Sequence, residues 1–253
     1  MFTKAIVRIP AKSMVDGITT AGLGKPDYEL ALEQHRNYIQ ALESCGLAVT
    51  VLDAEERYPD AQFVEDVALL LPRCAIMTRP GAESRRGEVV KVSTLLDDYY
   101  DKVDTIQAPG TVDAGDIMMV GEHCYIGLSE RTNHEGAAQI IGFLESAGYS
   151  GSMISISEAL HLKSSVSYLE NNRLVVSGEL CHAAEFADFD PISIPEFEGY
   201  AANCVWINDR VLVAQGYPQS IEKIRATGLE IIELDVSEFC KLDGGLSCLS
   251  LRF

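Results

Sequence analysis

The sequence predicts a single α/β domain over residues 1–253, in which about five ββαβ-type units close into a propeller-like ring. The main observation is a recurring hairpin of two apolar strands joined by a polar turn, repeated about every 40 to 50 residues. Helical patterns and further short strands fill the intervals between hairpins. One unpaired apolar strand remains near each end of the chain, and pairing these two strands completes a fifth unit and removes exposed strand edges.

Four complete hairpins are visible in the sequence. The turns Gly121-Glu122, Asn171-Asn172 and Asn208-Asp209 contain the residues that tight hairpins require. The two half-units at the ends of the chain are Ala5–Ile9 and Leu246–Leu251. The hairpins span Val67–Thr78, Ile117–Gly127, Val166–Ser177 and Cys204–Ala214.

Three helices are expected between the hairpins. Apolar residues recur at helical spacing from Tyr28 to Leu42, and Gly46 follows as a stop signal. The segment Thr132-Asn-His-Glu135 is a capping-box pattern that predicts a second helix start, and a third helix begins near Pro218. Short strands are expected after the helical stretches, at 49–52, 103–106, 153–156 and 231–234. An open α/β sandwich with hairpin extensions is the alternative architecture.

Composition narrows the class of protein. The 38 acidic and 20 basic residues give a net charge of −18, whereas nucleic-acid surfaces need clustered Lys and Arg, so no nucleic-acid partner is expected. No membrane partner is expected either, because no segment approaches the roughly 20 apolar residues of a membrane helix. The seven cysteines are odd in number and form no Cys-x-x-Cys pair, which favours a reducing, cytoplasmic location. Neither a cofactor motif nor metal-ligand spacing is present, so no cofactor and no metal are expected.

Polar residues gather at or just before the first strand of each unit. If rotation relates the units, these positions converge on one axis and form a small-molecule pocket there. Cys248 follows Gly244 and Gly245, which let the backbone approach a ligand closely, and His161 suits acid–base chemistry near neutral pH. The other six cysteines are interpreted as small buried apolar residues. The five converging stretches are 63–66, 112–116, 160–164, 201–204 and 243–248.

A thiol, an imidazole and several carboxylates predict covalent chemistry on a cationic electrophile. Glu65 and Asp66 run directly into an apolar strand, where ionised groups need a partner. Carboxylates hold a guanidinium or amidinium group by charge-assisted hydrogen bonds and so orient its central carbon for attack by the Cys248 thiolate. The bound cation also favours ionisation of the thiol, which neighbouring carboxylates alone would oppose.

Longer motifs run from the first strand to the end of the chain. They are Leu23–Tyr28, Asp60–Asp66, Thr78–Arg86, Ala108–Val120, His161–Lys163 and Asp243–Leu251. In these motifs the sequence resembles the guanidino-group-modifying superfamily, which has the pentein fold, and within it the compact bacterial dimethylarginine dimethylaminohydrolases. The resemblance implies a five-bladed, pseudo-symmetric α/β propeller. It also implies hydrolysis of Nω-methylated arginine to citrulline and methylamine or dimethylamine through a covalent thiouronium intermediate.

The same resemblance implies the role of each site residue. Cys248 would be the nucleophile, His161 the acid and then the base, and Asp113 the group that orients His161. Some members have Glu at the position of Asp113, so the shorter side chain implies either a closer backbone or a contact through water. The implied substrate contacts are Asp60, Glu65 and Asp66 for the guanidinium, Phe63 near the reacting carbon, Arg85 and Arg131 for the α-carboxylate, Ile18 and the Leu242 carbonyl at the amino-acid end, and Ser247 beside the nucleophile.

Several alternatives stay open at this point. The chain could be an arginine deiminase or an amidinotransferase, although Lys163 stands where the related deiminases have a carboxylate. It could also be a catalytically silent binder of methylated guanidines. The segment 11–26 is either a lid over the pocket or a connecting loop. The sequence allows a homodimer, and it leaves open whether Cys248 and His161 together trap zinc.

Overall fold

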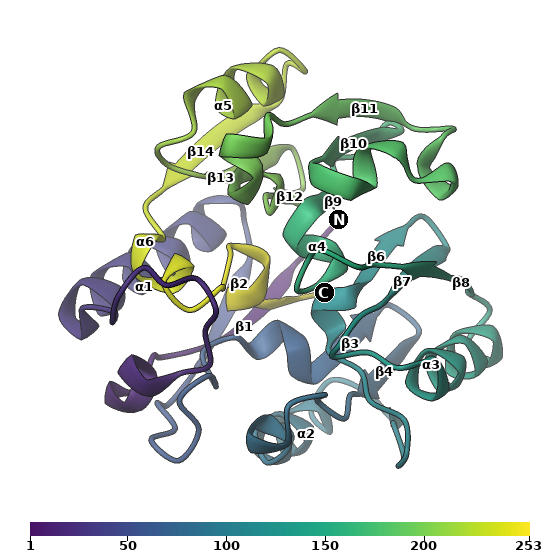
Figure 1. The fold of residues 1–253 in the computed structure, drawn as a ribbon. Coiled ribbons are helices and arrows are strands. Elements are labelled where there is room, and N and C mark those ends of the chain that lie inside the picture. Colours follow the sequence, from purple (N-terminus) through teal and green to yellow (C-terminus); the bar gives the residue numbers. More distant parts are fainter.

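The computed structural model describes all 253 residues and contains five three-stranded sheets that follow one another around a common centre (Figure 1). In each sheet the middle strand pairs antiparallel with one neighbour and parallel with the other. The predicted five-unit α/β propeller is therefore confirmed. The sheets remain separate, so the strands do not form one closed barrel. The sheet orders are β15-β1-β2, β3-β4-β5, β6-β7-β8, β9-β10-β11 and β12-β13-β14.

The strand positions agree closely with the repeat. The sheet that joins the two ends of the chain pairs Ala5 with Arg252 and Ile6 with Leu251, as expected for the fifth unit. Asn208 strengthens this closure, because its side chain bonds the backbone of both Phe2 and Cys45. The strands are β1 (Lys4–Arg8), β2 (Ala48–Leu52), β3 (Ala68–Leu71), β4 (Cys74–Met77), β5 (Val103–Thr105), β6 (Ile117–Val120), β7 (His123–Leu128), β8 (Ser150–Ser155), β9 (Val166–Tyr168), β10 (Arg173–Val176), β11 (Asp190–Ser193), β12 (Val205–Ile207), β13 (Arg210–Ala214), β14 (Glu230–Leu234) and β15 (Leu251–Arg252).

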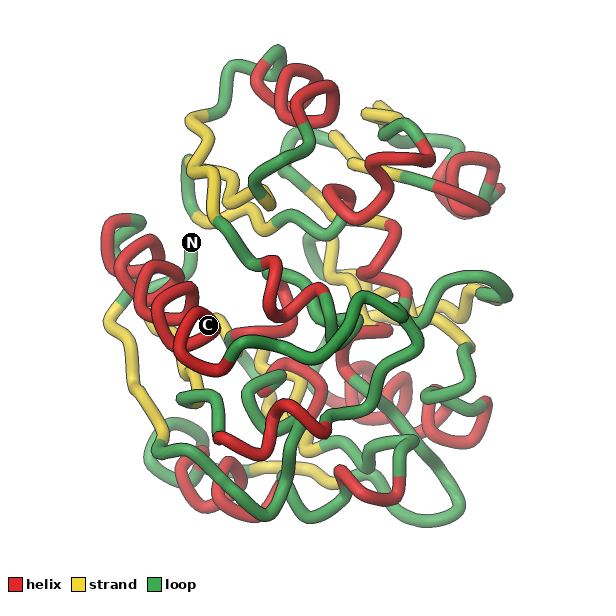
Figure 2. Tube along the Cα trace, turned by 60° about the vertical axis from the view of Figure 1, so that its left-hand side comes forward, coloured by secondary structure: helices red, strands yellow, loops and turns green.

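The longer helices lie outside the strands (Figure 2). The three expected helices are present, but α3 begins one residue later than the capping box predicts. Its N-cap is Asn133, whose side chain accepts from the Gly136 amide, because the Thr132 hydroxyl donates to Asp116 instead. The helices are α1 (Tyr28–Ser44), α2 (Val89–Leu96), α3 (His134–Ser146) and α5 (Pro218–Arg225), together with the single turns α4 (Leu162–Ser165) and α6 (Ser237–Cys240).

The unit formed by β9, β10 and β11 departs from the expected helix–strand pattern. Two 3-10 turns, Gly178–His182 and Ala184–Phe186, take the place of an α-helix. Strand β11 then follows, where no strand was expected, because three of its four residues are exposed and one is proline. Pairing with β10 defines this strand, and the apolar pattern of its own residues does not.

Each of the five strands nearest the axis is preceded by a short helical segment. These strands are β3, β6, β9, β12 and β15, and β15 contacts β3 while β9 contacts both β6 and β12. The segments also contact one another, so their side chains converge at one end of the ring. They are η2 (Val64–Val67), η4 (Ala114–Asp116), α4 (Leu162–Ser165), η7 (Glu196–Ala202) and η8 (Ser247–Leu249).

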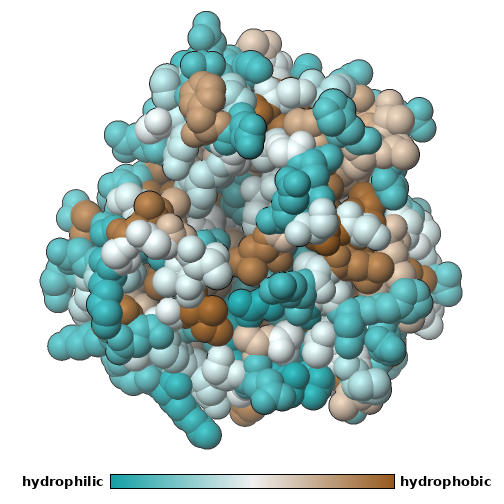
Figure 3. All heavy atoms as spheres, viewed as in Figure 1, coloured by the Kyte–Doolittle hydropathy of each residue, from teal (hydrophilic) through white to brown (hydrophobic).

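The exterior agrees with the acidic composition. The face seen in Figure 3 is largely hydrophilic at its rim, and apolar residues lie nearer its middle. The apolar core is divided among the units, and its largest cluster packs α1 against β1 and against β12, β13 and β14. None of the helices combines the length and the hydropathy needed to cross a bilayer.

Candidate active site

A small pocket lies where the short segments converge. It has an accessible volume of about 30 Å³ and brings together Cys248, His161, Asp60 and Asp66, which are far apart in the sequence. The predicted convergence of a thiol, an imidazole and carboxylates is thus present. The lining residues are Ile18, Asp60, Phe63, Asp66, Arg85, Arg131, Leu160, His161, Leu242, Asp243, Gly244 and Cys248, and we call this the catalytic pocket.

His161 is held by Asp113 directly. Its Nε2 lies 3.1 Å from Asp113 Oδ2, so the shorter acid needs no intervening water. The other oxygen of Asp113 accepts from the Gly81 amide at 2.9 Å, which fixes the carboxylate. Burial lowers the pKa of His161, but the negative charges of Asp66, Asp113 and Asp116 outweigh burial and raise the pKa to about 9. The imidazole is therefore protonated at neutral pH in the unliganded pocket.

Cys248 is the middle residue of the last short segment, η8, and is buried. Its Sγ accepts a hydrogen bond from the Gly245 amide at 3.4 Å. Burial, reinforced by the charges of Asp66 and Glu65, raises the pKa of the thiol to about 12. The unliganded pocket therefore holds a neutral thiol, and a cation must enter before the thiolate becomes favourable.

Asp66 links the pocket to a buried ion-pair network. Its Oδ2 binds Arg85 Nη1 at 2.6 Å, and its Oδ1 accepts from the Gly115 amide at 3.1 Å. Burial raises the pKa of Asp66, but the charges of His161 and Arg85 outweigh burial and hold the pKa below its ordinary value. Arg85 also pairs with Glu88, whose carboxylate accepts from both Nε and Nη2. Burial raises the pKa of Glu88 to about 7.

Asp60 differs from Asp66 because it has no cationic partner in contact. Its Oδ1 accepts from the Ile18 amide at 3.0 Å, and burial raises the pKa of its carboxyl above the ordinary value. This carboxylate is therefore available to a cationic ligand in the pocket. The Phe63 ring beside it packs against Gly244, where any side chain would collide with the ring.

The segment 11–26 contains the 3-10 turn η1 (Lys12–Asp16) and carries Ile18 to the pocket. Beyond Ile18 it is tied to the far side of the site. The Thr19 hydroxyl donates to the Lys241 carbonyl at 2.8 Å, and the Thr20 amide donates to Asp243 Oδ2 at 2.6 Å. The segment therefore lies against the pocket, which agrees both with a lid and with a connecting loop. Its motion as a lid stays a prediction.

Glu65 and Ser247 lie outside the catalytic pocket, in contrast to the expectation that they line it with Cys248. Glu65 Oε2 accepts from the Ser247 hydroxyl at 2.7 Å, and Glu65 Oε1 pairs with Lys163 and with Arg252. The reason is geometric, because successive side chains of a tight helical turn point in different directions. Asp66 and Cys248 face the catalytic pocket, whereas the residue preceding each one faces a second cavity along the axis.

The two arginines expected at the α-carboxylate both line the pocket but differ in their environment. Arg85 is buried, and its guanidinium already contacts Asp66, Glu88 and two backbone carbonyls. Arg131 is half-buried and forms no side-chain hydrogen bond or ion pair within the protein. A fork of two equivalent arginines is therefore not present, and Arg131 has the guanidinium that is free for a ligand.

Sequence reasoning missed several supporting residues. Glu88 holds Arg85, and Asn203 bonds both the Ser247 amide and its hydroxyl, which fixes the segment carrying Cys248. Asn203 lies in the converging stretch 201–204, and this location was the only feature of the sequence that could have marked it as a site residue. Asp116 accepts from the Leu162 amide and so ties the unit of β6, β7 and β8 to the segment after His161. No sequence motif marks Glu88, because its contact with Arg85 is apparent only in the folded structure.

One group of side chains has the composition of a metal site. Ligand atoms of Asp66, Asp113 and His161 lie within 4.8 Å of one another. The carboxylates already accept hydrogen bonds from Arg85, Gly115 and Gly81. A nearby guanidinium disfavours a further cation, so this arrangement fits a charge network around His161 better than a metal centre.

The ring of five ββαβ units with these residues at its axis defines a protein with the pentein fold, a conclusion supported by solved structures of the same architecture. A Pseudomonas aeruginosa dimethylarginine dimethylaminohydrolase with its cysteine replaced by serine, complexed with citrulline, has a TM-score of 0.98 and 55% identity over 100% of both chains. A histidine-to-glycine variant, as its adduct with S-methyl-L-thiocitrulline, also has a TM-score of 0.98. The N-terminal domain of the arginine dihydrolase ArgZ shares the fold, with a TM-score of 0.89 and 20% identity.

Sequence comparison leads to the family. The family model for N,N dimethylarginine dimethylhydrolase, eukaryotic, matches residues 24–185. The P. aeruginosa N(G),N(G)-dimethylarginine dimethylaminohydrolase is 55% identical over 100% of both chains. The Streptomyces coelicolor protein of the same name is 35% identical over 98% of this chain and 96% of its own. The chain belongs to the dimethylarginine dimethylaminohydrolase family.

The pairing of His161 with Asp113 leads to the first prediction. Asp113→Asn keeps an oxygen for the Gly81 amide but removes a negative charge, so we expect the pKa of His161 to fall by at least one unit from about 9. NMR titration of the imidazole measures this change, with the exposed Asp97→Asn as control. An unchanged pKa would show that Asp113 does not act on His161.

The raised pKa of His161 also makes the free energy of unfolding depend on pH. Its contribution to stability is complete below pH 6.5, the ordinary pKa of histidine, and is lost as the pH rises through about 9.

Gly115 leads to the second prediction, because it lies against both charged partners of the pocket. A Cβ there would lie 2.8 Å from Asp66 Oδ1 and 3.0 Å from His161 Nδ1. Gly115→Ala should therefore lower the midpoint of thermal unfolding, with a loss of roughly 1–3 kcal/mol from overpacking. The control is Gly142→Ala in α3, where a Cβ meets nothing within 4 Å, and it should stabilise the fold by about 0.5–1 kcal/mol. Equal effects of the two substitutions would contradict the assigned packing.

Proposed function

We propose that this protein hydrolyses Nω-methylated arginine to citrulline and methylamine or dimethylamine, as a cysteine-dependent amidine hydrolase. The observation that carries the proposal is a single pocket that contains a thiol, a protonated imidazole and two buried carboxylates, one of them without a cationic partner in contact. Family membership supports the same reaction, because the 55% identical relative carries this activity in its name.

Substrate binding follows from the charges of the pocket. The methylated guanidinium would enter between Asp60 and Asp66 and form charge-assisted hydrogen bonds with their oxygens. Phe63 would pack near the planar group, and the free guanidinium of Arg131 would bind the α-carboxylate. Ile18 and the Leu242 carbonyl would contact the amino-acid end. Arg85 would act through Asp66, which it holds in place.

The first chemical step is attack of sulfur on the guanidinium carbon. The bound cation offsets the charges of Asp66 and Glu65, which lowers the pKa of Cys248 from about 12, and the thiol loses its proton to solvent. The thiolate forms a C–S bond, and the tetrahedral carbon then expels the methylated nitrogen. His161 donates a proton to that nitrogen, so it leaves as neutral dimethylamine or methylamine. A covalent thiouronium on Cys248 remains.

The second step restores the enzyme. Neutral His161 accepts a proton from water as the oxygen attacks the thiouronium carbon. The C–S bond then breaks, and the carbon keeps its new oxygen as the ureido group of citrulline. The proton still on that oxygen passes to the sulfur, so Cys248 is again a thiol and His161 is again protonated. Asp113 keeps the imidazole oriented through both transfers, which explains why a positioning residue contributes to the rate.

Lys163 bears on the choice between this reaction and that of arginine deiminase. The deiminase pattern has a carboxylate two residues after the histidine, whereas Lys163 here points away from the catalytic pocket and pairs with Glu65 at 2.7 Å. No side chain from that position can therefore hold an unmethylated guanidinium nitrogen. This favours methylated arginine as the substrate.

The test measures citrulline formed from dimethylarginine, monomethylarginine and arginine. We expect product from the methylated substrates and at least about tenfold less from arginine, because the discriminating carboxylate is missing. Cys248→Ser should lower the rate by at least about 10³-fold, and Asp113→Ala should also lower it. Cys181→Ser removes a half-buried thiol outside the pocket and should have no effect.

Two results would reject the proposal. Citrulline from arginine alone would favour the deiminase alternative. Tight binding of methylated arginine without product would favour a silent binder.

A further inference from the structure

A second cavity, of about 360 Å³, lies along the axis of the ring, and we call it the axial cavity. All five strands nearest the axis contribute to its wall, and it shares no lining residue with the catalytic pocket. Exposed Met1 and Gly121 lie at its outer end, so solvent can reach it. Its size and mainly apolar lining are typical of small-molecule sites.

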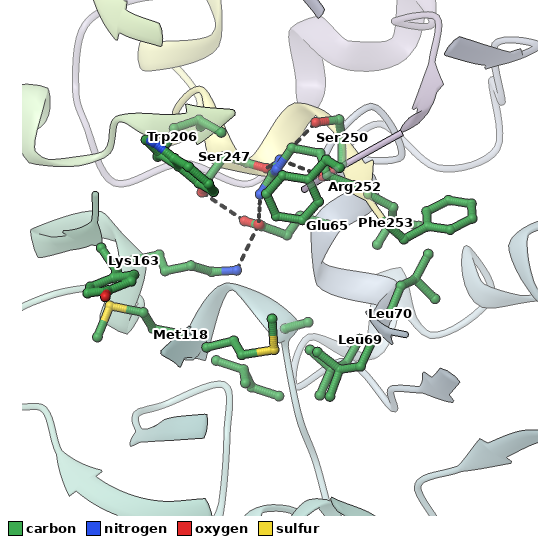
Figure 4. Close-up of a pocket in the computed structure, with 18 of the residues that line it drawn as sticks. Glu65, Leu69, Leu70, Met118, Lys163, Trp206, Ser247, Ser250, Arg252 and Phe253 are labelled. Atoms are coloured by element: carbon green, nitrogen blue, oxygen red, sulfur yellow. Dashed lines mark hydrogen bonds and ion pairs between the residues drawn. The ribbon is translucent and has the colours of Figure 1, made fainter. Parts of the chain in front are cut away.

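The Lys163, Arg252 and Glu65 side chains of the axial cavity lie together on one side (Figure 4). Lys163 Nζ lies 2.7 Å and Arg252 Nη2 lies 2.8 Å from the same atom, Glu65 Oε1. Two cations thus share one buried carboxylate, which leaves one positive charge in excess. The only other carboxylate side chain in the lining belongs to Glu170, near the turn between β9 and β10. The excess positive charge is therefore local to the cluster of Lys163, Arg252 and Glu65, since Glu170 balances it over the whole lining.

Lys163 has the means to bind a ligand. An ammonium group has three N–H donors, and Glu65 is its only partner within the protein. Arg252 is more fully engaged, because Nη1 also donates to Ser247 and Ser250. In Figure 4 the ammonium group of Lys163 projects toward the middle of the cavity, between apolar walls formed by Met118, Leu69 and Trp206.

We propose that the axial cavity binds a small amphipathic anion, an organic carboxylate with an apolar body. The carboxylate would pair with Lys163, and the apolar body would lie among Trp206, Met118, Leu69 and Phe253. A cavity of about 150 Å³ holds benzene, so this larger space accommodates a ring with a short acidic arm. The ligand would lie behind the catalytic residues, because Glu65 and Ser247 are the chain neighbours of Asp66 and Cys248.

The chain contains a built-in reporter for this site. Trp206 is the only tryptophan, and it lines the axial cavity and not the catalytic pocket. Titration of the protein with 3-phenylpropionate should therefore change the tryptophan fluorescence in a saturable way. The uncharged 3-phenylpropanamide and the cationic 3-phenylpropylamine have the same apolar body, and we expect each to bind at least tenfold more weakly. Equal responses to all three probes, or no response to the acid, would overturn the proposal.

Variants locate the binding site. Lys163→Met should weaken binding of the acid at least tenfold without changing that of the amide, and Lys163→Arg should retain binding. Lys223→Met removes an exposed lysine outside the cavity and should have no effect. Arg131→Gln distinguishes binding in the axial cavity from binding in the catalytic pocket, because it removes a guanidinium that lines the catalytic pocket alone. Loss of binding in Arg131→Gln but not in Lys163→Met would assign the probe to the catalytic pocket and reject the proposal.

Discussion

The pairing of buried carboxylates with a small number of buried cations is the interaction on which this molecule depends. An ionised group inside a protein costs several kcal/mol unless it is compensated, so each buried acid must have a partner or a raised pKa. Arg85 holds Asp66 and Glu88, and Asp113 holds His161. The Asp60 carboxylate has neither a lysine nor an arginine in contact, and burial raises its pKa. The pocket is therefore short of positive charge at the place where a guanidinium substrate would bind, and the same shortage keeps Cys248 protonated until the substrate arrives.

The ring of repeated units brings these charged side chains together, although the internal repeat is weak in sequence. A short helical segment before each inner strand brings polar residues from five distant stretches to one end of the axis. Because such turns are tight, adjacent residues have different directions, and Asp66 and Glu65 face separate cavities. The symmetry is limited to the backbone. The same backbone unit therefore carries a different chemical group at each repeat. The substrate-facing carboxylate of Asp66 lies in η2, the orienting acid Asp113 precedes η4, and the imidazole of His161 precedes α4.

Much of the fold could be predicted from sequence because it rests on local signals. The turns Asn171-Asn172 and Asn208-Asp209 mark hairpins, and the apolar spacing from Tyr28 marks α1. Strand β11 could not be predicted, because its pairing with β10 defines it while most of its own residues are exposed. In the site, the convergence of Cys248, His161 and Asp66 followed from the repeat. The direction of Glu65 and the engagement of Arg85 by Glu88 did not, because both depend on side-chain packing between units.

The most direct test of this account traps the nucleophile. S-Methyl-L-thiocitrulline carries a methanethiolate that leaves without protonation by histidine, so the His161→Gly variant should form the covalent adduct but hydrolyse it slowly. Peptide mass spectrometry should then locate the amidino-ornithine adduct, formed with loss of methanethiol, on Cys248, and Cys248→Ser should carry none. An adduct on another cysteine, or none in His161→Gly that remains folded, would contradict a site in which the axis brings this sulfur to a bound cationic carbon.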